Sequence, residues 1–240
     1  KLYFLYKKYV EDPYYHLIRR YPQLFQGGHI LDIGANVGYT AYQFSKIVSS
    51  GYKVFAFEPD LTNFNVLRYV IEMYKMNNIV YPFQIAIGES QKQVDFWQRS
   101  NGHADHRIKT DALSNHHSID AAKVVKINQD TVDHFTEARQ INEAVKFIKI
   151  DVQGYEPSVL AGMSRIIKQS EQLSFSMEYS PQILIEMGFN VDSFINSIEE
   201  IGFKLYEIKH NGRLDRIENL KNLALPKRGY MEILFTRESF

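Results

Sequence analysis

Short apolar runs alternate along the chain with longer stretches in which apolar residues recur every three or four positions. The runs are "HILDI", "KVFAF", "YPFQIAI", "VKFIKI" and "LSFSM". Helical periodicity covers residues 39–48, 61–76, 157–168 and 181–200. This alternation predicts βαβ units and a mostly parallel sheet, and therefore an α/β fold.

The pattern changes towards the end of the chain. Gly202 is placed to end the last periodic helix, and "FKLYEI", "HNGR" and "YMEILF" follow it. These segments predict a hairpin-like antiparallel end to the sheet, with polar loop material over residues 210–229.

Two segments stand apart from this pattern. Residues 98–123 are polar, rich in histidine and poor in periodic apolar residues, so we expect a long inserted loop of functional importance. Residues 1–27 are aromatic and partly helical in pattern, and we expect them to pack on the core. Residues 28–240 then form the main domain.

Composition excludes several classes of protein. The chain has 240 residues, enough for one sizeable domain, with 28 basic and 28 acidic side chains. A formal charge of zero and the lack of a basic, aromatic stripe argue against a nucleic-acid partner. Zero cysteines exclude disulfides, zinc–thiolate sites and thiol nucleophiles.

No apolar run approaches the roughly 18 residues of a membrane-spanning helix. The segment "KLYFLYKKYV" is too short and too charged for a signal peptide. We therefore expect no membrane span and a cytoplasmic location. The sequence leaves the oligomeric state open.

The segment "ILDIGANVG" is a strand that ends in a glycine loop with the pattern Asp32-x-Gly34-x-Asn36-x-Gly38. A dinucleotide-binding loop needs glycine where Asn36 stands, because the backbone there closes on a pyrophosphate. A carboxylate at Asp32 suits a ligand with an ammonium and a sulfonium better than one with phosphates. S-adenosylmethionine has that charge pattern.

The next two strands extend this site. "VFAFEPD" ends on Glu58, where a carboxylate can accept both hydroxyls of a ribose, although an exposed strand-end acid is the simpler alternative. "FQIAIGES" brings Ala86 to the same edge, where it can flank an adenine.

A fourth strand carries a further acid. "FIKIDVQGYEPSVLAGM" ends in Asp151 before Gly154 and a helix that opens at Glu156. An acid at this position can meet the substrate or the methyl donor, and an ordinary turn cap is the alternative.

Taken together, "ILDIGANVGYTA", "VFAFEPD", "QIAIGES", "KIDVQGYEPSVLAGM" and "FSMEYSPQIL" make the chain resemble the FkbM family of S-adenosylmethionine-dependent methyltransferases. The resemblance implies a Rossmann-like class I fold, with a mostly parallel seven-stranded sheet, one antiparallel strand and helices on both faces. It also implies O-methylation of a hydroxyl on a sugar, glycan or other small molecule, with S-adenosylmethionine as the cofactor.

The resemblance also assigns residues. The loop from Asp32 to Gly38 would cradle the methionine part of the donor and Glu58 would bind its ribose. Asp151 and Glu156 would line the active-site side, with Tyr155 also on the substrate side. The chain departs from the family at Gln153, Tyr155 and Gln84, where a glutamate, a small residue and an asparagine are more usual.

A hydroxyl acceptor needs a base nearby, because its own pKa lies far above neutrality. The candidates are Asp151 and two histidines of the inserted loop, His103 and His106, of which His103 is favoured by the adjacent Gly102. We expect no metal. Two other functions stay open: a binding module that kept the fold, and an NAD-dependent oxidoreductase, against which Asn36 argues.

Overall fold

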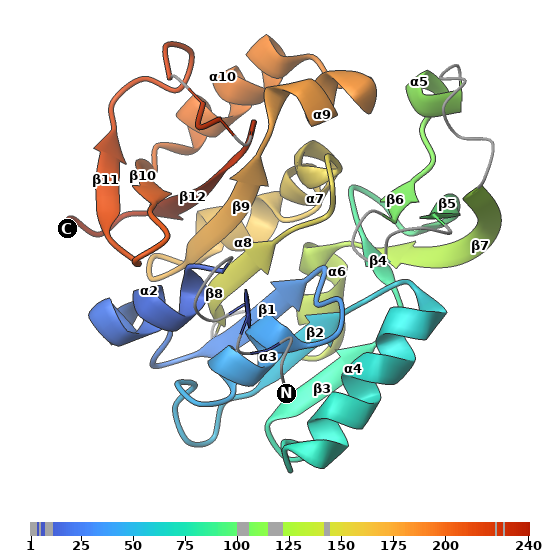
Figure 1. Ribbon diagram of the computed structural model, residues 1–240. Coiled ribbons are helices and arrows are strands. Elements are labelled where there is room, and N and C mark those ends of the chain that lie inside the picture. Colours follow the sequence, from blue (N-terminus) through green and yellow to red (C-terminus); the bar gives the residue numbers. More distant parts are fainter. Residues whose placement is uncertain are drawn as a thin grey trace.

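The computed structural model describes residues 4, 6–7, 12–99, 106–114, 122–141, 145–223, 225–227 and 229–240. Its centre is an eight-stranded sheet in the order β11-β10-β12-β9-β8-β1-β2-β3, shown in Figure 1. The strands are β1 (His29–Ile33), β2 (Val54–Phe57), β3 (Val80–Phe83), β8 (Val145–Ile150), β9 (Ser174–Tyr179), β10 (Lys204–Ile208), β11 (Leu214–Ile217) and β12 (Met231–Thr236).

The predicted seven-stranded sheet with one antiparallel strand is confirmed as the core of this larger sheet. Strands β3, β2, β1, β8 and β9 are parallel neighbours, and β12 runs antiparallel to both β9 and β10. The expected antiparallel end is also present. However, part of the segment expected to be polar loop forms β11, which pairs with β10 as a hairpin and adds the eighth strand.

A second sheet, which the sequence analysis did not predict, has the order β4-β7-β5-β6. Its strands are β4 (Ala86–Ile87), β5 (Lys92–Arg99), β6 (Arg107–Ile108) and β7 (Ala122–Asp130). The single strand expected in "YPFQIAI" is thus divided, because β3 ends at Phe83 on the edge of the large sheet and β4 joins β7. Residues 98–123 connect β5 to β7, and their described part carries β6 and the short helix α5.

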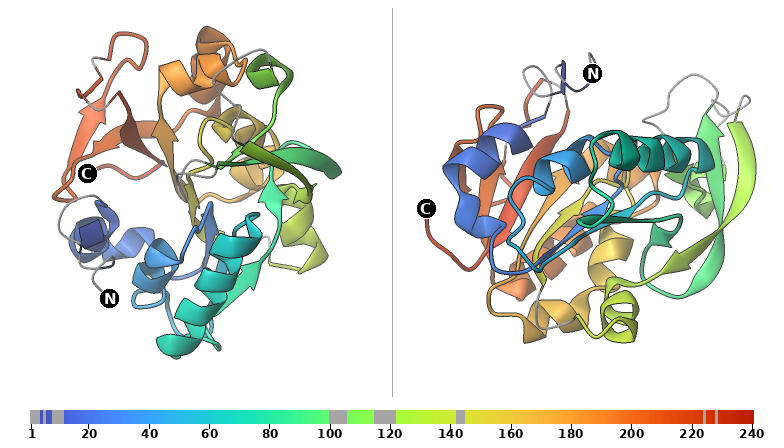
Figure 2. Two further views of the ribbon diagram at one scale, coloured as in Figure 1. Left: turned by 45° about the vertical axis from the view of Figure 1, so that its right-hand side comes forward. Right: turned by 90° about the horizontal axis from the view of Figure 1, so that it is seen from below.

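Helices cover both faces of the large sheet, as predicted. The helices are α2 (Tyr14–Arg20), α3 (Tyr39–Phe44), α4 (Leu61–Met73), α5 (Asp111–Ser114), α6 (Val132–Ala138), α7 (Glu156–Ala161), α8 (Ser164–Gln169), α9 (Pro181–Glu186) and α10 (Val191–Ile201), with a 3-10 turn, η2, at Pro22–Leu24. In the right-hand view of Figure 2, α2, α3 and α4 lie on one face of the sheet and α6 and α8 lie on the other.

Two of the predicted helices are each interrupted. The helix expected over 157–168 divides into α7 and α8 at Gly162 and Met163, and the helix expected over 181–200 divides into α9 and α10. The second break contains Gly188 in the left-handed region, with φ of +87°, and Asn190, whose side chain accepts the N–H of Ser193 to cap α10. Apolar periodicity continues across both breaks, so it did not reveal them.

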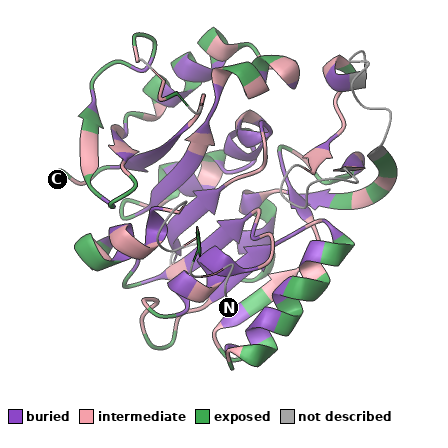
Figure 3. Ribbon diagram, in the orientation of Figure 1, coloured by how far each residue is buried: buried purple, intermediate pink, exposed green. Residues whose placement is uncertain are grey.

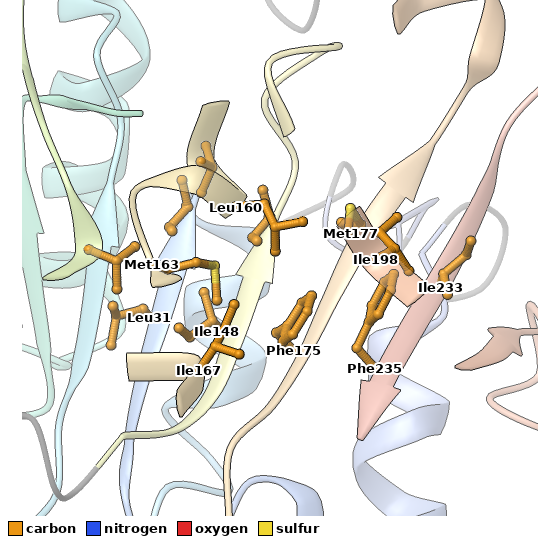
Figure 4. Close-up of a cluster of buried hydrophobic side chains, with 14 of the residues drawn as sticks. Leu31, Ile148, Leu160, Met163, Ile167, Phe175, Met177, Ile198, Ile233 and Phe235 are labelled. Atoms are coloured by element: carbon orange, nitrogen blue, oxygen red, sulfur yellow. The ribbon is translucent and has the colours of Figure 1, made fainter. Parts of the chain in front are cut away.

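Each face of the sheet has its own apolar core. On one face α6, α7, α8 and α10 pack on inward-facing residues of β1, β8, β9 and β12, where Phe175 and Phe235 stack at 4.5 Å between ring centroids (Figure 4). On the other face α2, α3 and α4 pack around Phe25, Phe44 and Phe147. Burial is accordingly greatest along the central strands, and exposed residues gather on the outer sides of helices such as α4 (Figure 3).

The helix α2 is joined to the sheet by polar as well as apolar contacts. Its Tyr14 is buried, and the hydroxyl lies 2.7 Å from the Ser176 hydroxyl of β9. The same hydroxyl donates to Glu232 of β12 at 3.3 Å.

Among the helices of the described residues, none has the length and apolar character needed to cross a bilayer.

Candidate active site

One pocket of about 350 Å³ lies at the carboxyl ends of the central parallel strands. Its lining includes six of the residues predicted from sequence: Gly34, Asn36, Glu58, Ala86, His106 and Asp151. In open α/β sheets this edge is where ligands bind, and the volume falls within the range of small-molecule sites. The pocket runs along the edge from β2, past β1 and β8, to β9.

The loop after β1 has the close backbone packing that its glycines suggested. Gly34 has φ of +78°, and a Cβ at this position would lie 1.8 Å from the carbonyl oxygen of Asp151. Asn36 also has a positive φ, 49°, a conformation that asparagine tolerates better than most residues. Gly38, with φ of +86°, lies against Leu67 of α4 and does not line the pocket.

Glu58 fixes this loop to the end of β2. One carboxylate oxygen accepts the N–H of Asn36 at 2.8 Å and the other accepts the N–H of Asp60 at 2.8 Å. Burial raises the pKa of Glu58 to about 8, against the lowering effect of these hydrogen bonds. Each oxygen keeps a second lone pair, so the carboxyl group can still meet the hydroxyls of a ribose.

Asp32 has a different position from the one expected. Its side chain is fully buried beneath the loop, where one oxygen accepts the Thr40 hydroxyl at 2.8 Å. The other oxygen lies 3.7 Å from the Lys149 ammonium. Asp32 does not line the pocket, so it supports the loop from below.

Lys149, which the sequence analysis did not single out, is the central cation of the site. Its ammonium donates to the Gly34 carbonyl and to Asp151, both at 3.2 Å. Burial alone would lower the pKa of Lys149, but Asp151 and Asp32 raise it above its usual value. The side chain is therefore charged and buried, and it links β8 to the glycine loop.

Asp151 is held by two donors. Lys149 meets one of its oxygens at 3.2 Å and the Gln153 amide donates to the other at 2.9 Å. Burial raises the pKa of Asp151, but Lys149 and Gln153 outweigh burial and bring that pKa below its ordinary value. Asp151 is thus an ionised hydrogen-bond acceptor and a weaker proton acceptor than an ordinary aspartate.

The two residues expected on the substrate side lie behind the pocket wall. The Glu156 carboxyl accepts the N–H groups of Val152 at 3.1 Å and Gly154 at 3.3 Å, so it shapes the turn after β8. Burial raises the pKa of Glu156 to about 7. Tyr155 is buried beside Phe189, and neither Tyr155 nor Glu156 lines the pocket.

The second sheet forms one wall of the pocket. Phe96 of β5 lines it together with His106, Arg107 and Ile108. The His106 ring lies 3.9 Å from Asp60, which also caps α4 and accepts a hydrogen bond from Gln98 of β5. His106 is thus placed at the Glu58 end of the pocket. His103 lies outside the described residues.

These features fit S-adenosylmethionine. The Glu58 carboxyl suits the ribose, and Phe57, Ile85 and Ile87 supply apolar surface next to it for an adenine. The buried Nε of Arg107 has no hydrogen-bond partner among the described residues, so it is a donor that a ligand can satisfy. Within the same described ranges, no group of three or more acidic or histidine side chains is arranged to hold a metal ion.

The model of the family described as "Methyltransferase FkbM domain" matches residues 32–214. The chain belongs to the FkbM methyltransferase family. This range contains every predicted site residue and most of the large sheet, and membership of the family supports S-adenosylmethionine as the cofactor.

Solved structures agree on the fold. Methyltransferase FkbM from Methylobacillus flagellatus aligns over 93% of this chain with 19% identity and a TM-score of 0.55. The chain spans only 48% of that protein. A candidate O-methyltransferase from Klebsiella pneumoniae aligns over 94% of this chain and 79% of its own, with 12% identity and a TM-score of 0.50. Comparison with curated proteins gave no match.

Proposed function

We propose that this FkbM methyltransferase transfers the methyl group to a hydroxyl oxygen of an uncharged small molecule, a sugar or another glycan. The observation that carries the proposal is the order of the groups along the pocket. Glu58 stands at the β2 end, the Gly34 loop follows, and the carboxyls of Asp151 and Glu178 stand at the β8 and β9 end. Carboxyl oxygens in this position suit the hydroxyls of an acceptor.

S-adenosylmethionine, when bound, supplies an activated methyl group and a good leaving group. The chain must then align the acceptor oxygen with the methyl carbon and exclude water. We assign the glycine loop, Asn36 and Glu58 to holding the donor, and Asp151 to orienting the acceptor hydroxyl. Phe96 and Ile108 of the second sheet close the pocket over both.

His106 is assigned to the donor side, because its ring pairs with Asp60 beside Glu58. This leaves the choice of base between His103 and a carboxyl at the β9 end.

The proposal is tested with S-adenosylmethionine labelled in the methyl group and a panel of methyl glycosides, phosphosugars and amines. Formation of a labelled methyl ether from a neutral glycoside is the expected result. Label in amine products only would show a nitrogen acceptor and overturn O-methylation. Tight S-adenosylhomocysteine binding without transfer to any acceptor would favour the alternative of a binding module.

A further inference from the structure

Glu178 lies beside Asp151 at the carboxyl edge of the sheet. Strands β8 and β9 pair in parallel with Ile150 opposite Met177, so Asp151 and Glu178 occupy the next position on each strand. Side chains alternate between the faces of a strand. Ile150 and Met177 belong to the core on the α7 and α10 face, so Asp151 and Glu178 both turn to the opposite face.

The Glu178 carboxyl lines the pocket and has no hydrogen-bond partner among the described residues. The neighbouring carboxyls are all hydrogen-bonded: Glu58, Asp151 and Glu156 each accept two hydrogen bonds, and Glu232 accepts one from Tyr14. Across the described part of the chain, Glu178 forms no hydrogen bond and no ion pair. A half-buried carboxyl of this kind is available to a ligand.

The groups around Glu178 are mostly acidic. Glu232 stands directly opposite it on β12, and Asp151 and Glu156 approach from the turn after β8 and from α7. Lys149 is the nearby cation, and it is already bonded to Asp151 and Gly34. Lys7 lines the same pocket.

These surroundings favour a protonated carboxyl in the absence of a ligand. Burial raises the pKa of Glu178 to about 9, and the adjacent carboxylates add to the rise. A cation that enters the pocket favours the ionised form instead, and an opposite charge within about 4–6 Å lowers the pKa of a carboxyl by about 1–3 units.

We propose that Glu178 is the catalytic base of this methyltransferase, and that the positive charge of the bound donor converts it to the carboxylate that accepts the proton of the acceptor hydroxyl. This inference rests on the proposed function. The acceptor oxygen forms a bond to the methyl carbon as the carbon–sulfur bond breaks, and that bond's electron pair goes to sulfur. The hydroxyl proton goes to the Glu178 carboxylate.

The same arrangement limits the acceptor. A phosphate or carboxylate group at the β9 end would lie against both Asp151 and Glu178 and would be repelled. An uncharged polyol can instead donate hydroxyl hydrogens to both carboxyls. The acceptor is therefore expected to be a neutral sugar or polyol at its reacting end.

The test compares two ligands that differ at sulfur, and it needs no acceptor. S-adenosylmethionine carries the sulfonium charge and S-adenosylhomocysteine does not. Proton release on binding is measured by titration calorimetry at about pH 8 in buffers of different ionisation enthalpy. Binding of S-adenosylmethionine is expected to release about half to one proton more from the protein than binding of S-adenosylhomocysteine. The reason is that only the sulfonium charge ionises Glu178.

Two variants make the test specific. Glu178→Gln should bind S-adenosylhomocysteine as the wild type does, and the difference in proton release between the two ligands should be lost. The control is Glu218→Gln, which removes a surface carboxyl that pairs with Arg216 and lies outside the pocket lining, and it should keep the difference.

Equal proton release by the two ligands in the wild type would overturn the role of Glu178, as would a difference that persists in Glu178→Gln. In both cases the two ligands would still bind, so the proposed methyl transfer would not be overturned. Failure of the folded wild type to bind either ligand would instead overturn the proposed function and this inference together. Equal proton release in the wild type overturns the role of Glu178 even where Glu178→Gln does not fold.

Discussion

The Lys149 ammonium lies 3.2 Å from the Gly34 carbonyl oxygen, so a side chain of β8 holds the glycine loop that follows β1. The same ammonium lies 3.2 Å from Asp151 and 3.7 Å from Asp32. One buried cation thus balances two carboxylates and fixes the glycine loop. Lys149 therefore links the loop that we propose to hold the donor with the Asp151 side of the pocket.

Replacing Lys149 with methionine should destabilise the fold strongly. The substitution leaves Asp32 and Asp151 without their cation, and a broken buried ion pair costs about 3–5 kcal/mol. Urea unfolding measures the loss in the free energy of unfolding. The control is Lys126→Met, at a side chain that is 65% exposed and pairs with Asp95 on the surface, and it should cost less than about 1 kcal/mol. Equal losses in the two variants would contradict the role given to Lys149.

Gly34→Ala should impair donor binding through the backbone. The new Cβ would lie 1.8 Å from the Asp151 carbonyl oxygen, so the loop and the turn after β8 must separate. We expect at least about a tenfold loss of S-adenosylhomocysteine affinity, equivalent to about 1.4 kcal/mol. Gly27→Ala is the control, because φ there is +89° but no atom lies within 4 Å of a Cβ. If Gly27→Ala weakened binding as much, the loss would come from backbone strain alone.

The buried carboxyls predict an unusual dependence of stability on pH. Burial raises the pKa of Glu232 to about 8 in the folded protein, so the folded state retains a proton that the unfolded chain releases at lower pH. The stabilisation is complete below the ordinary pKa of 4.5, falls as pH rises and is lost above about 8. Glu232→Gln should therefore raise the melting temperature at pH 9 relative to wild type and change it little at pH 4.

Glu218→Gln gives the comparison for that experiment. The Glu218 side chain is 80% exposed and pairs with Arg216 on the surface. The melting temperature of the Glu218→Gln variant should therefore match that of the wild type at both pH values. A stabilisation by Glu232→Gln that is the same at pH 4 and pH 9 would show that titration is not its cause.

Much of the proposed donor site was predictable because its signals are local in sequence. The strand, the Gly34–Asn36 loop and Glu58 follow each other over a short span, and parallel strands bring their carboxyl ends to one edge. The alternation of strand and helix likewise predicted the mostly parallel sheet, and the family resemblance implied its seven strands. The two helix breaks were missed because apolar periodicity continues through them.

The rest of the site depends on tertiary pairing. Lys149 was missed because it lies within the apolar run "VKFIKI". A lysine in a central strand, two residues before Asp151, is nevertheless a usable signal, because the two side chains share one face of the strand. Glu178 could not be identified as a site residue from the sequence, because its place beside Asp151 and opposite Glu232 depends on the strand register. The second sheet was missed because β5 and β7 pair across a long intervening segment. Sequence periodicity indicates local structure and does not indicate which distant strands pair.

Calorimetric titration of the folded protein with S-adenosylhomocysteine tests most directly whether this pocket binds the donor. Wild type should bind with micromolar affinity, and Glu58→Ala should lose about 5- to 150-fold, because two hydrogen bonds to the ribose are lost at about 0.5–1.5 kcal/mol each. Glu89→Ala, at a surface side chain that is 52% exposed, should bind as the wild type does. Binding of NAD in place of S-adenosylhomocysteine, or unchanged binding by Glu58→Ala, would contradict the account.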